Sequence, residues 1–372
     1  MKRRSYLSHA FLAGLLPTLL IGASCRAPFS IRNDAQTAAQ PTEMREHSMV
    51  PFPIPADLLS PHGAHANPPL EVVIPPDSPL TISRIELGEL LFSDRRLSRD
   101  QSMACVDCHR PELSFTSPVV TARLRNPPVI FNRLFSHRQF WNARAGNLED
   151  QIRMTMAEPV EMNLPGPEAV KRLRKDTELV TRFRLAFGTS SIEEEDLYRA
   201  LASFVRSIIS YDSKFDQSQR PNSKIHLTEI EEKGRKLFFE KYKCSVCHSG
   251  PNFTNEILSP PCYPQFGQAS SRPLQNAQTK TKRRFNLEVK TPSLRELSGS
   301  SPYFHNGGLT TIEETIEFYD RSGPPPADFL NAELFQVPIN EIGKDEVQQL
   351  KAFLGTLNGR IEYGHPRKSV TR

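Results

Sequence analysis

Two copies of one pentapeptide pattern, Cys-x-x-Cys-His, constrain this chain more than any other feature of its sequence. The copies occupy residues 105–109 and 244–248. Two thiols at this spacing can add to the vinyl groups of one haem, and the histidine that follows can then ligate the iron. We therefore expect two covalently attached haem c groups. The attachment points would be Cys105, Cys108, Cys244 and Cys247, and the iron ligands His109 and His248.

Other uses of paired cysteines fit these motifs less well. A zinc half-site would not place a histidine directly after both pairs, and a thioredoxin-like dithiol would stand in a βαβ pattern. Cys25 and Cys262 lie outside the motifs. We expect no disulfide between them, because Cys25 falls in a terminal segment, and we expect Cys262 to be a free thiol.

The N-terminus has the features of an export signal. Basic residues 2–4 precede an apolar stretch, residues 10–23, which is short for a membrane helix and is interrupted by Pro17. Small residues 22–24 then lead to Cys25, as at a bacterial lipoprotein cleavage site. Lipidation of Cys25 and ordinary cleavage both fit, and either predicts a periplasmic protein, with a lipid anchor in the first case.

Charge and proline content bound the remaining organisation. The formal net charge is only +5 over 372 residues and no run of Lys and Arg occurs, so we expect no nucleic-acid partner. Residues 51–80 hold nine prolines, which exclude regular structure. We predict a signal peptide at 1–25, a Pro-rich leader at 26–80, and haem domains at 81–222 and 223–372.

The two predicted domains repeat one order of elements. The pattern Gly-x-x-Leu-Phe occurs twice, once from Gly88 to Phe92 and once from Gly234 to Phe238. Capping boxes are predicted at 83–86 and 228–231, and each helix is followed by Cys-x-x-Cys-His and then by Phe-Thr. Strand signals are scarce. We predict a mainly α fold with long loops, in which two cytochrome-c-like haem domains arise by internal duplication.

Further helices are predicted around these repeats. Apolar residues from Leu197 to Ile208 mark one face of a helix, the polar stretch 211–224 marks a domain boundary, and Val347 to Leu357 form a closing helix. A capping box at 311–314 predicts a helix that reaches about Tyr319.

A block of residues between the motifs carries a family resemblance. It comprises Phe140-Trp141-Asn142-Ala143-Arg144-Ala145-Gly146, then Gln151, then Glu161-Met162. With Thr291-Pro292-Ser293-Leu294-Arg295 and the 302–307 segment, it resembles the bacterial dihaem cytochrome c peroxidase family. The resemblance covers roughly residues 83–358.

The resemblance implies roles for individual residues. The first haem would be the peroxide site, with Glu161 as acid–base and Gln151 beside it, and Trp141 would lie between the two irons. Arg144 and His305 would contact haem. A calcium ion would be held by Asn126 and the carbonyl oxygens of Ser300 and Pro302, because hard oxygen donors suit Ca²⁺.

Two departures favour the MauG-like branch of the family. Residues 110–136 contain no histidine, so no loop histidine would cap the first iron. We expect His137 to be structural. No methionine occurs after Met162, and Tyr319 stands where the resemblance places the sixth ligand of the second haem. Tyrosinate would favour ferric over ferrous iron.

We therefore expect an exported dihaem c-type peroxidase that reduces hydrogen peroxide at the first haem and shares oxidising equivalents with the second. Its electrons would come from a small redox protein or from a side chain of a partner protein, as in MauG-like enzymes. The alternative is a non-catalytic dihaem electron-transfer protein with two six-coordinate haems.

Overall fold

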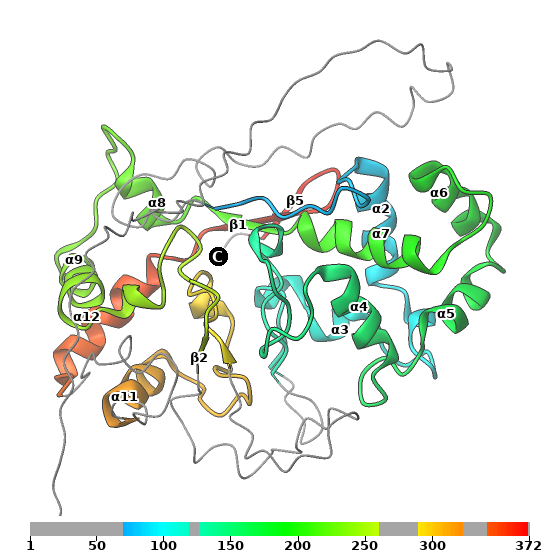
Figure 1. The fold of residues 1–372 in the computed structure, drawn as a ribbon. Helices are drawn as coiled ribbons and strands as arrows, with labels where there is room; N and C mark the ends of the chain where they lie inside the picture. Colours follow the sequence, from blue (N-terminus) through cyan, green and yellow to red (C-terminus); the bar gives the residue numbers. More distant parts are fainter. Residues whose placement is uncertain (1–69, 119–125, 260–288, 323–340, 371–372) are drawn as a thin grey trace, which may run out of the picture. The chain divides into compact units, whose positions relative to one another are not determined.

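The computed structural model describes residues 70–118, 126–259, 289–322 and 341–370, and these are mainly helical, as predicted (Figure 1). The α-helices are α2 (Ile82–Phe92), α3 (Cys105–Cys108), α4 (Leu148–Ala157), α5 (Gly166–Leu173), α6 (Thr177–Phe187), α7 (Glu194–Arg206), α8 (Lys214–Gln219), α9 (Glu229–Lys236), α11 (Ile312–Ser322) and α12 (Lys344–Gly355). Short 3₁₀ turns span Arg95–Leu97, Pro111–Leu113, Arg133–Phe135, Cys244–Val246 and Leu297–Gly299, and a π-helical turn spans Leu237–Lys241.

Five short strands join the described helices. β1 (Ile209–Tyr211), β4 (Arg360–Tyr363) and β5 (Lys368–Val370) form an antiparallel sheet in the order β1-β4-β5, in which Ser210 lies opposite Ile361. β2 (Leu258–Ser259) and β3 (Val289–Lys290) form a second antiparallel pair. The first sheet connects the centre of the chain to its last described residues.

A close crossing of α2 and α7 organises the first half. The two helix backbones approach at Gly88, where an added Cβ would overlap the carbonyl oxygen of Ala200 and would lie 2.8 Å from Cβ of Phe204. One turn later Phe92 packs on Phe204, with ring centroids 5.0 Å apart. Only glycine permits this approach, because any side chain would push the helices apart.

The second half repeats this crossing with α9 and α12. An added Cβ at Gly234 would overlap the carbonyl oxygen of Gln349 and would lie 2.8 Å from Cβ of Phe353. Phe238, four residues after the glycine, packs on Phe353 with ring centroids 5.2 Å apart. The glycine, the aromatic pair and their spacing recur, which is the geometry expected of a duplicated unit.

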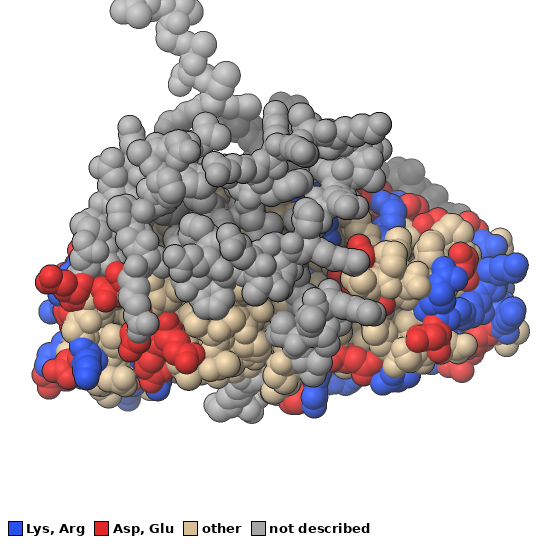
Figure 2. Space-filling model, turned by 90° about the horizontal axis from the view of Figure 1, so that it is seen from below, with Lys and Arg blue, Asp and Glu red and all other residues tan. Residues whose placement is uncertain are grey.

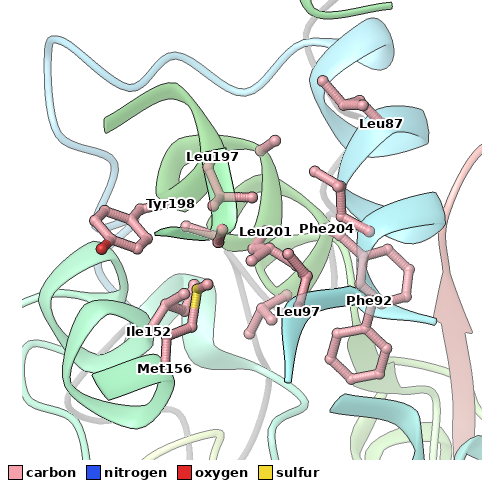
Figure 3. Close-up of a cluster of buried hydrophobic side chains, with 14 of the residues drawn as sticks. Leu87, Phe92, Leu97, Ile152, Met156, Leu197, Tyr198, Leu201 and Phe204 are labelled. Atoms are coloured by element: carbon pink, nitrogen blue, oxygen red, sulfur yellow. The ribbon is translucent and has the colours of Figure 1, made fainter. Parts of the chain in front are cut away.

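Each crossing lies in its own hydrophobic cluster. Figure 3 shows the first cluster, in which side chains of α2, α4 and α7 converge from separate parts of the sequence. Its labelled members are Leu87, Phe92, Leu97, Ile152, Met156, Leu197, Tyr198, Leu201 and Phe204. The second cluster draws its buried members from Phe215 to Leu357. The predicted domain limits themselves stay a prediction.

The C-terminal residues return to the first cluster. Ile361 in β4 is buried there, and Tyr363 packs edge-on against Phe115 with ring centroids 5.1 Å apart. Two ion pairs join the same segment to α2: Glu86 accepts from His365 at 2.9 Å, and Glu89 accepts from Lys368 at 2.6 Å. The first core is therefore completed by the end of the chain.

Several element limits differ from the sequence predictions. Thr81, not Ser83, is the N-cap of α2 and accepts from the backbone of Arg84. Ser83 lies inside the helix, and Glu86 bonds to His365. The boxes at 228–231 and 311–314 are confirmed.

The structure adds detail at two further places. Helix α11 runs on to Ser322, past the predicted limit near Tyr319. The polar stretch 211–224 contains helix α8, because Phe215 is fully buried in the second cluster and anchors that segment.

Charged side chains of both signs mix on the surface. In Figure 2, Lys and Arg alternate with Asp and Glu over the described part of the face that it draws, without a continuous basic area there. Within the described ranges, no helix is both long and apolar enough to span a membrane.

The helix crossing predicts a specific sensitivity to one methyl group. Replacement Gly234→Ala should lower the free energy of unfolding by about 1–3 kcal/mol, because the new Cβ cannot fit between α9 and α12. Gly355→Ala is the matched control, since an added Cβ there meets nothing within 4 Å. Urea denaturation of both variants measures the effect. Equal midpoints for the two variants would contradict the close crossing.

Candidate haem-binding loops and the Trp141 segment

The first Cys-x-x-Cys-His motif forms one short helix and a tight return of the chain. Cys105 and Cys108 are the ends of α3, and His109 follows as its C-cap. The imidazole Nδ1 lies 3.0 Å from the carbonyl oxygen of Phe115. A carbonyl oxygen only accepts, so Nδ1 carries the proton and Nε2 keeps its lone pair for a metal.

The second motif builds the same arrangement. Nδ1 of His248 lies 3.2 Å from the carbonyl oxygen of Phe253 and 3.1 Å from that of Pro292. Phe115 and Phe253 both have positive φ, 57° and 50°, and both are fully buried. This left-handed backbone turns each carbonyl back toward its histidine. It is uncommon for a bulky residue and is held here by burial of the ring.

Burial sets the protonation of both motifs. It raises the pKa of the Cys105 and Cys244 thiols to about 12 and lowers the pKa of His248 to about 4. The pKa of His109 is lowered for the same reason. Each loop therefore presents protonated thiols and a neutral imidazole, which is the form that ligates iron.

These residues fit haem c. All four motif cysteines are free and half-buried, and each imidazole is oriented by a backbone carbonyl, the kind of outer partner that metal-ligating histidines have. The described residues contain no group of three or more His, Cys, Asp and Glu side chains that could hold a metal ion.

Glu161 lies near the first motif. Burial raises the pKa of the Cys108 thiol most, and the negative charge of Glu161 raises it next most. The same charge also raises the pKa of the Cys105 thiol. It is half-buried, in the turn after α4. Gln151, in α4, donates its amide to Oγ1 of Thr155 at 3.0 Å. Glu161 thus lies close enough to the first motif for its charge to act on both thiols.

Trp141 is held between segments from both halves of the sequence. Its indole Nε1 donates to the carbonyl oxygen of Asn126 at 2.8 Å, and its own carbonyl accepts from the backbone N–H of Lys290 at 2.6 Å. Asn126 in turn donates its backbone N–H to the carbonyl oxygen of His305 at 3.1 Å. A continuous hydrogen-bonded path therefore links Trp141 to the His305 loop.

Asn126 also bears on the predicted calcium site. Its side-chain amide donates to the carbonyl oxygens of Pro302 at 2.6 Å and Phe304 at 2.9 Å. Its Oδ1 is buried without a hydrogen-bond partner. Ser300 follows the 3₁₀ turn Leu297–Gly299 as its C-cap. An orphaned amide oxygen beside two carbonyls is a donor set that suits a hard cation.

The remaining predicted residues lie at separate places. Tyr319 in α11 is half-buried, and its ring centroid is 6.3 Å from that of Phe304 in the His305 loop. Arg144 is exposed, with its guanidinium 3.4 Å from the centroid of the Phe140 ring. His137 is exposed and lies 3.4 Å from Glu71. Cys25 and Cys262 lie outside the described residues.

Sequence reasoning missed the residues that brace the second loop. Arg295 is buried and forms a bidentate ion pair with Asp216, both bonds 2.8 Å long, while its Nε donates to the carbonyl oxygen of Pro251. Pro251 follows the second motif closely. Arg295 stood in a segment that marked the family resemblance, but its distance along the chain from Asp216 gave no sign that the two side chains meet.

Comparison with known proteins identifies the family. The family model for "Di-haem cytochrome c peroxidase" matches residues 83–224. The "Cytochrome-c peroxidase IdrP1" of Pseudomonas sp. (strain SCT) is 31% identical over 334 residues, covering 80% of this chain and 87% of that protein. The chain belongs to the di-haem cytochrome c peroxidase family. This peroxidase-family chain is also 30% identical to the "Methylamine utilization protein MauG" of Methylophilus methylotrophus, over 78% of the chain and 87% of that relative.

Solved structures agree with this family assignment. The crystal structure of "a MauG-like protein associated with microbial copper homeostasis" is 26% identical and has a TM-score of 0.63, covering 77% of this chain and 93% of that one. The diheme peroxidase BthA from Burkholderia thailandensis, 20% identical with a TM-score of 0.60, shares the fold. Family membership makes haem the cofactor of this peroxidase-family chain.

The Asn126 contacts predict that its side chain stabilises the junction around Trp141. Asn126→Ala should lower the free energy of unfolding by about 1–3 kcal/mol, because the carbonyls of Pro302 and Phe304 would lose their donor. Asn306→Ala is the control, since Asn306 makes one exposed hydrogen bond, to Gly308, in the same loop. Urea midpoints compare the two. An equal loss in both variants would show that the Asn126 contacts add nothing specific.

Proposed function

We propose that this protein is an exported dihaem c-type peroxidase of the MauG-like branch. It reduces hydrogen peroxide at the first haem, on His109, and shares oxidising equivalents with the second, on His248. The observation that carries the proposal is the pair of matching loops, in which each imidazole Nδ1 binds a backbone carbonyl and leaves Nε2 for iron. Curated relatives named as cytochrome-c peroxidases and as MauG support it.

Haem iron, when bound, supplies the site at which peroxide is held and the electrons that break its O–O bond. Reduction to two waters also consumes two protons, and one proton must move between the peroxide oxygens. The Glu161 carboxylate is suited to that task, because its charge lies near Cys108 and so beside the first motif. Gln151 would help to orient the peroxide in the same site.

The first haem is proposed to be open to peroxide without prior reduction. Residues 110–136 contain no histidine, and Nε2 of His137 lies 3.4 Å from a carboxylate oxygen of Glu71. The carbonyl of Phe115 would hold His109 in the correct tautomer on the other side of the iron. These features separate this chain from peroxidases that need an activation step.

Trp141 is proposed to connect the two haems. It is the only tryptophan of the chain, and both its indole N–H and its carbonyl are held by hydrogen bonds. Tyr319 is proposed as the sixth ligand of the second haem. A phenolate donor would keep that iron ferric and would make it hard to reduce. Arg144 and His305 are proposed haem contacts.

A calcium ion is proposed at Asn126. Rotating the Asn126 amide would turn its unpaired Oδ1 toward the Pro302 and Phe304 carbonyls, and the Ser300 carbonyl would complete the oxygen set. Chelation with EGTA should then lower the urea midpoint of the parent protein more than that of Asn126→Ala.

Two classes of electron donor are proposed for this peroxidase. A small redox protein would make this a peroxide-scavenging enzyme, and a side chain of a partner protein would make it a maturation enzyme. The absent loop histidine and Tyr319 favour the second class. Export to the periplasm is inferred from residues 1–25, with Cys25 either lipidated or removed with the signal.

Glu161→Gln tests the proposed chemistry. The amide cannot take up the peroxide proton, so the rate of reaction with peroxide should fall by about a hundredfold or more. Stopped-flow absorbance of the diferric protein measures this rate. Mass spectrometry of the same samples should show two covalent haems, which removes haem loss as an explanation.

Glu168→Gln is the matched control for this experiment. Glu168 lies in the following helix, α5, and its carboxylate makes an exposed ion pair with Arg99 at 3.5 Å. The Glu168→Gln variant should react with peroxide at the parent rate. A parent protein that carries two haems but does not react with peroxide would favour the electron-transfer alternative.

Tyr319→Phe tests the ligand proposal. Phenylalanine keeps the ring packed against Phe304 and Phe318 but removes the oxygen donor. The reduction potential of the second haem should rise, and its ferric absorption spectrum should change. Tyr242→Phe is the control, because it removes a hydroxyl that bonds to Glu346 in the same half. An unchanged second-haem spectrum in Tyr319→Phe would rule out phenolate ligation.

A further inference from the structure

Three charged side chains form a buried group beside the Trp141 segment. Nζ of Lys290, in β3, donates to Oε1 of Glu256 at 2.8 Å, and an amine nitrogen of the Arg133 guanidinium lies 3.4 Å from the same oxygen. The Lys290 side chain is 9% exposed, Arg133 is 15% exposed and Glu256 is 17% exposed. This group, called here the Lys290 triad, was not predicted from the sequence.

Glu256 is held rigidly at the centre of the triad. It accepts from the Ser136 hydroxyl and from the backbone N–H of His137 at 3.1 Å. Its φ is +52°, a left-handed conformation that is uncommon for glutamate and persists only where the surroundings enforce it. The segment after the second haem motif is thereby tied to the segment before Trp141.

Lys290 touches Trp141 directly through the backbone. Its N–H donates to the Trp141 carbonyl at 2.6 Å, so the residue that bears the buried ammonium is also the residue that holds the Trp141 backbone. The indole end of Trp141 is held separately by Asn126. Both ends of Trp141 are therefore held by hydrogen bonds, and one of the two partners is the residue that carries the buried ammonium.

When Lys290 is protonated, the triad carries one uncompensated positive charge. Arg133 stays protonated at any physiological pH. Burial alone would raise the pKa of Glu256, but the positive charges of Arg133 and Lys290 outweigh it and lower that pKa to about 2. Burial and the charge of Arg133 lower the pKa of Lys290 to about 7, although Glu256 opposes the shift. His137 faces the triad only through its backbone N–H and pairs with Glu71.

We propose that Lys290 is a positioning residue for Trp141, and that its ammonium charge, held by Glu256 and Arg133, limits how readily Trp141 gives up an electron. The inference rests on the proposed peroxidase function. In each transfer, one electron leaves the indole toward the first haem and is replaced by one from the second. No bond is made or broken, and the indole proton stays on Nε1.

The direction of the effect follows from the charge. Removing an electron from Trp141 creates a positive charge, which a neighbouring ammonium disfavours. Below about pH 7 Lys290 is protonated and sharing between the haems is slow, and above that pH it is neutral and sharing is faster. The rate at which the two haems share oxidising equivalents should therefore rise with pH. The expected rise is about tenfold between pH 6 and pH 8, or ~1.4 kcal/mol in activation free energy.

The test compares the intact dihaem protein with two Lys290 variants. Lys290→Met removes the charge and leaves Glu256 paired with Arg133, so sharing should be fast and independent of pH. Lys290→Arg keeps a charge that does not titrate, so sharing should be slow at both pH values. Stopped-flow spectra of the second haem after mixing with peroxide give the sharing rate, and first-haem spectra give the peroxide reaction separately.

The protonation of Lys290 also has a readout that needs no turnover. With ¹³C-labelled lysine in the diferric protein, one Cε resonance should titrate near neutral pH, and it should be missing from Lys290→Met. Trp141→Phe should abolish the pH dependence of sharing without moving that resonance.

Three results would overturn the proposal. They are a Lys290→Met variant that keeps the parent's pH profile, a Lys290→Arg variant that follows the parent, and the absence of a lysine that titrates near neutral pH. Failure of the parent to react with peroxide at the first haem would instead overturn the proposed function. Urea midpoints of the variants separate loss of fold from loss of charge.

Discussion

Each half of this protein depends on two helix backbones that touch at a glycine. At Gly88 and Gly234 the carbonyl of the partner helix occupies the space where a Cβ would stand, and an aromatic pair closes the crossing one turn later. The π-helical turn Leu237–Lys241 continues α9 almost to Cys244, and the 3₁₀ turn Arg95–Leu97 lies between α2 and Cys105. Each crossing helix thus precedes a haem motif in the sequence, and the loops that orient His109 and His248 follow it.

Around Trp141 the two halves meet through hydrogen bonds, whereas the C-terminal strands add apolar contacts such as Tyr363 on Phe115. The clusters around Phe204 and Phe353 are separate, and the contacts described between the Trp141 segment and the second half are backbone and charged groups. Hydrogen bonds require defined directions, so they hold Trp141 in one orientation. A junction of this kind can also carry charge-dependent behaviour, because its buried polar groups lie in a low dielectric.

Local patterns predicted local structure well. The repeated Gly-x-x-Leu-Phe and the capping box at Thr228 each act within a few residues, and the structure contains both features. The prediction at Ser83 was wrong because the neighbouring Thr81 offers the same hydroxyl and caps α2 instead. The triad of Arg133, Glu256 and Lys290 could not be predicted, since its members come from three distant segments and no local period links them.

The return of the C-terminal strands makes the first core depend on contacts that are distant in sequence. Ile361 fills a place in that core, and β4 pairs with β1 far from it along the chain. Contacts so distant in sequence form slowly. The packing of Ile361 therefore limits how fast the first core can be completed.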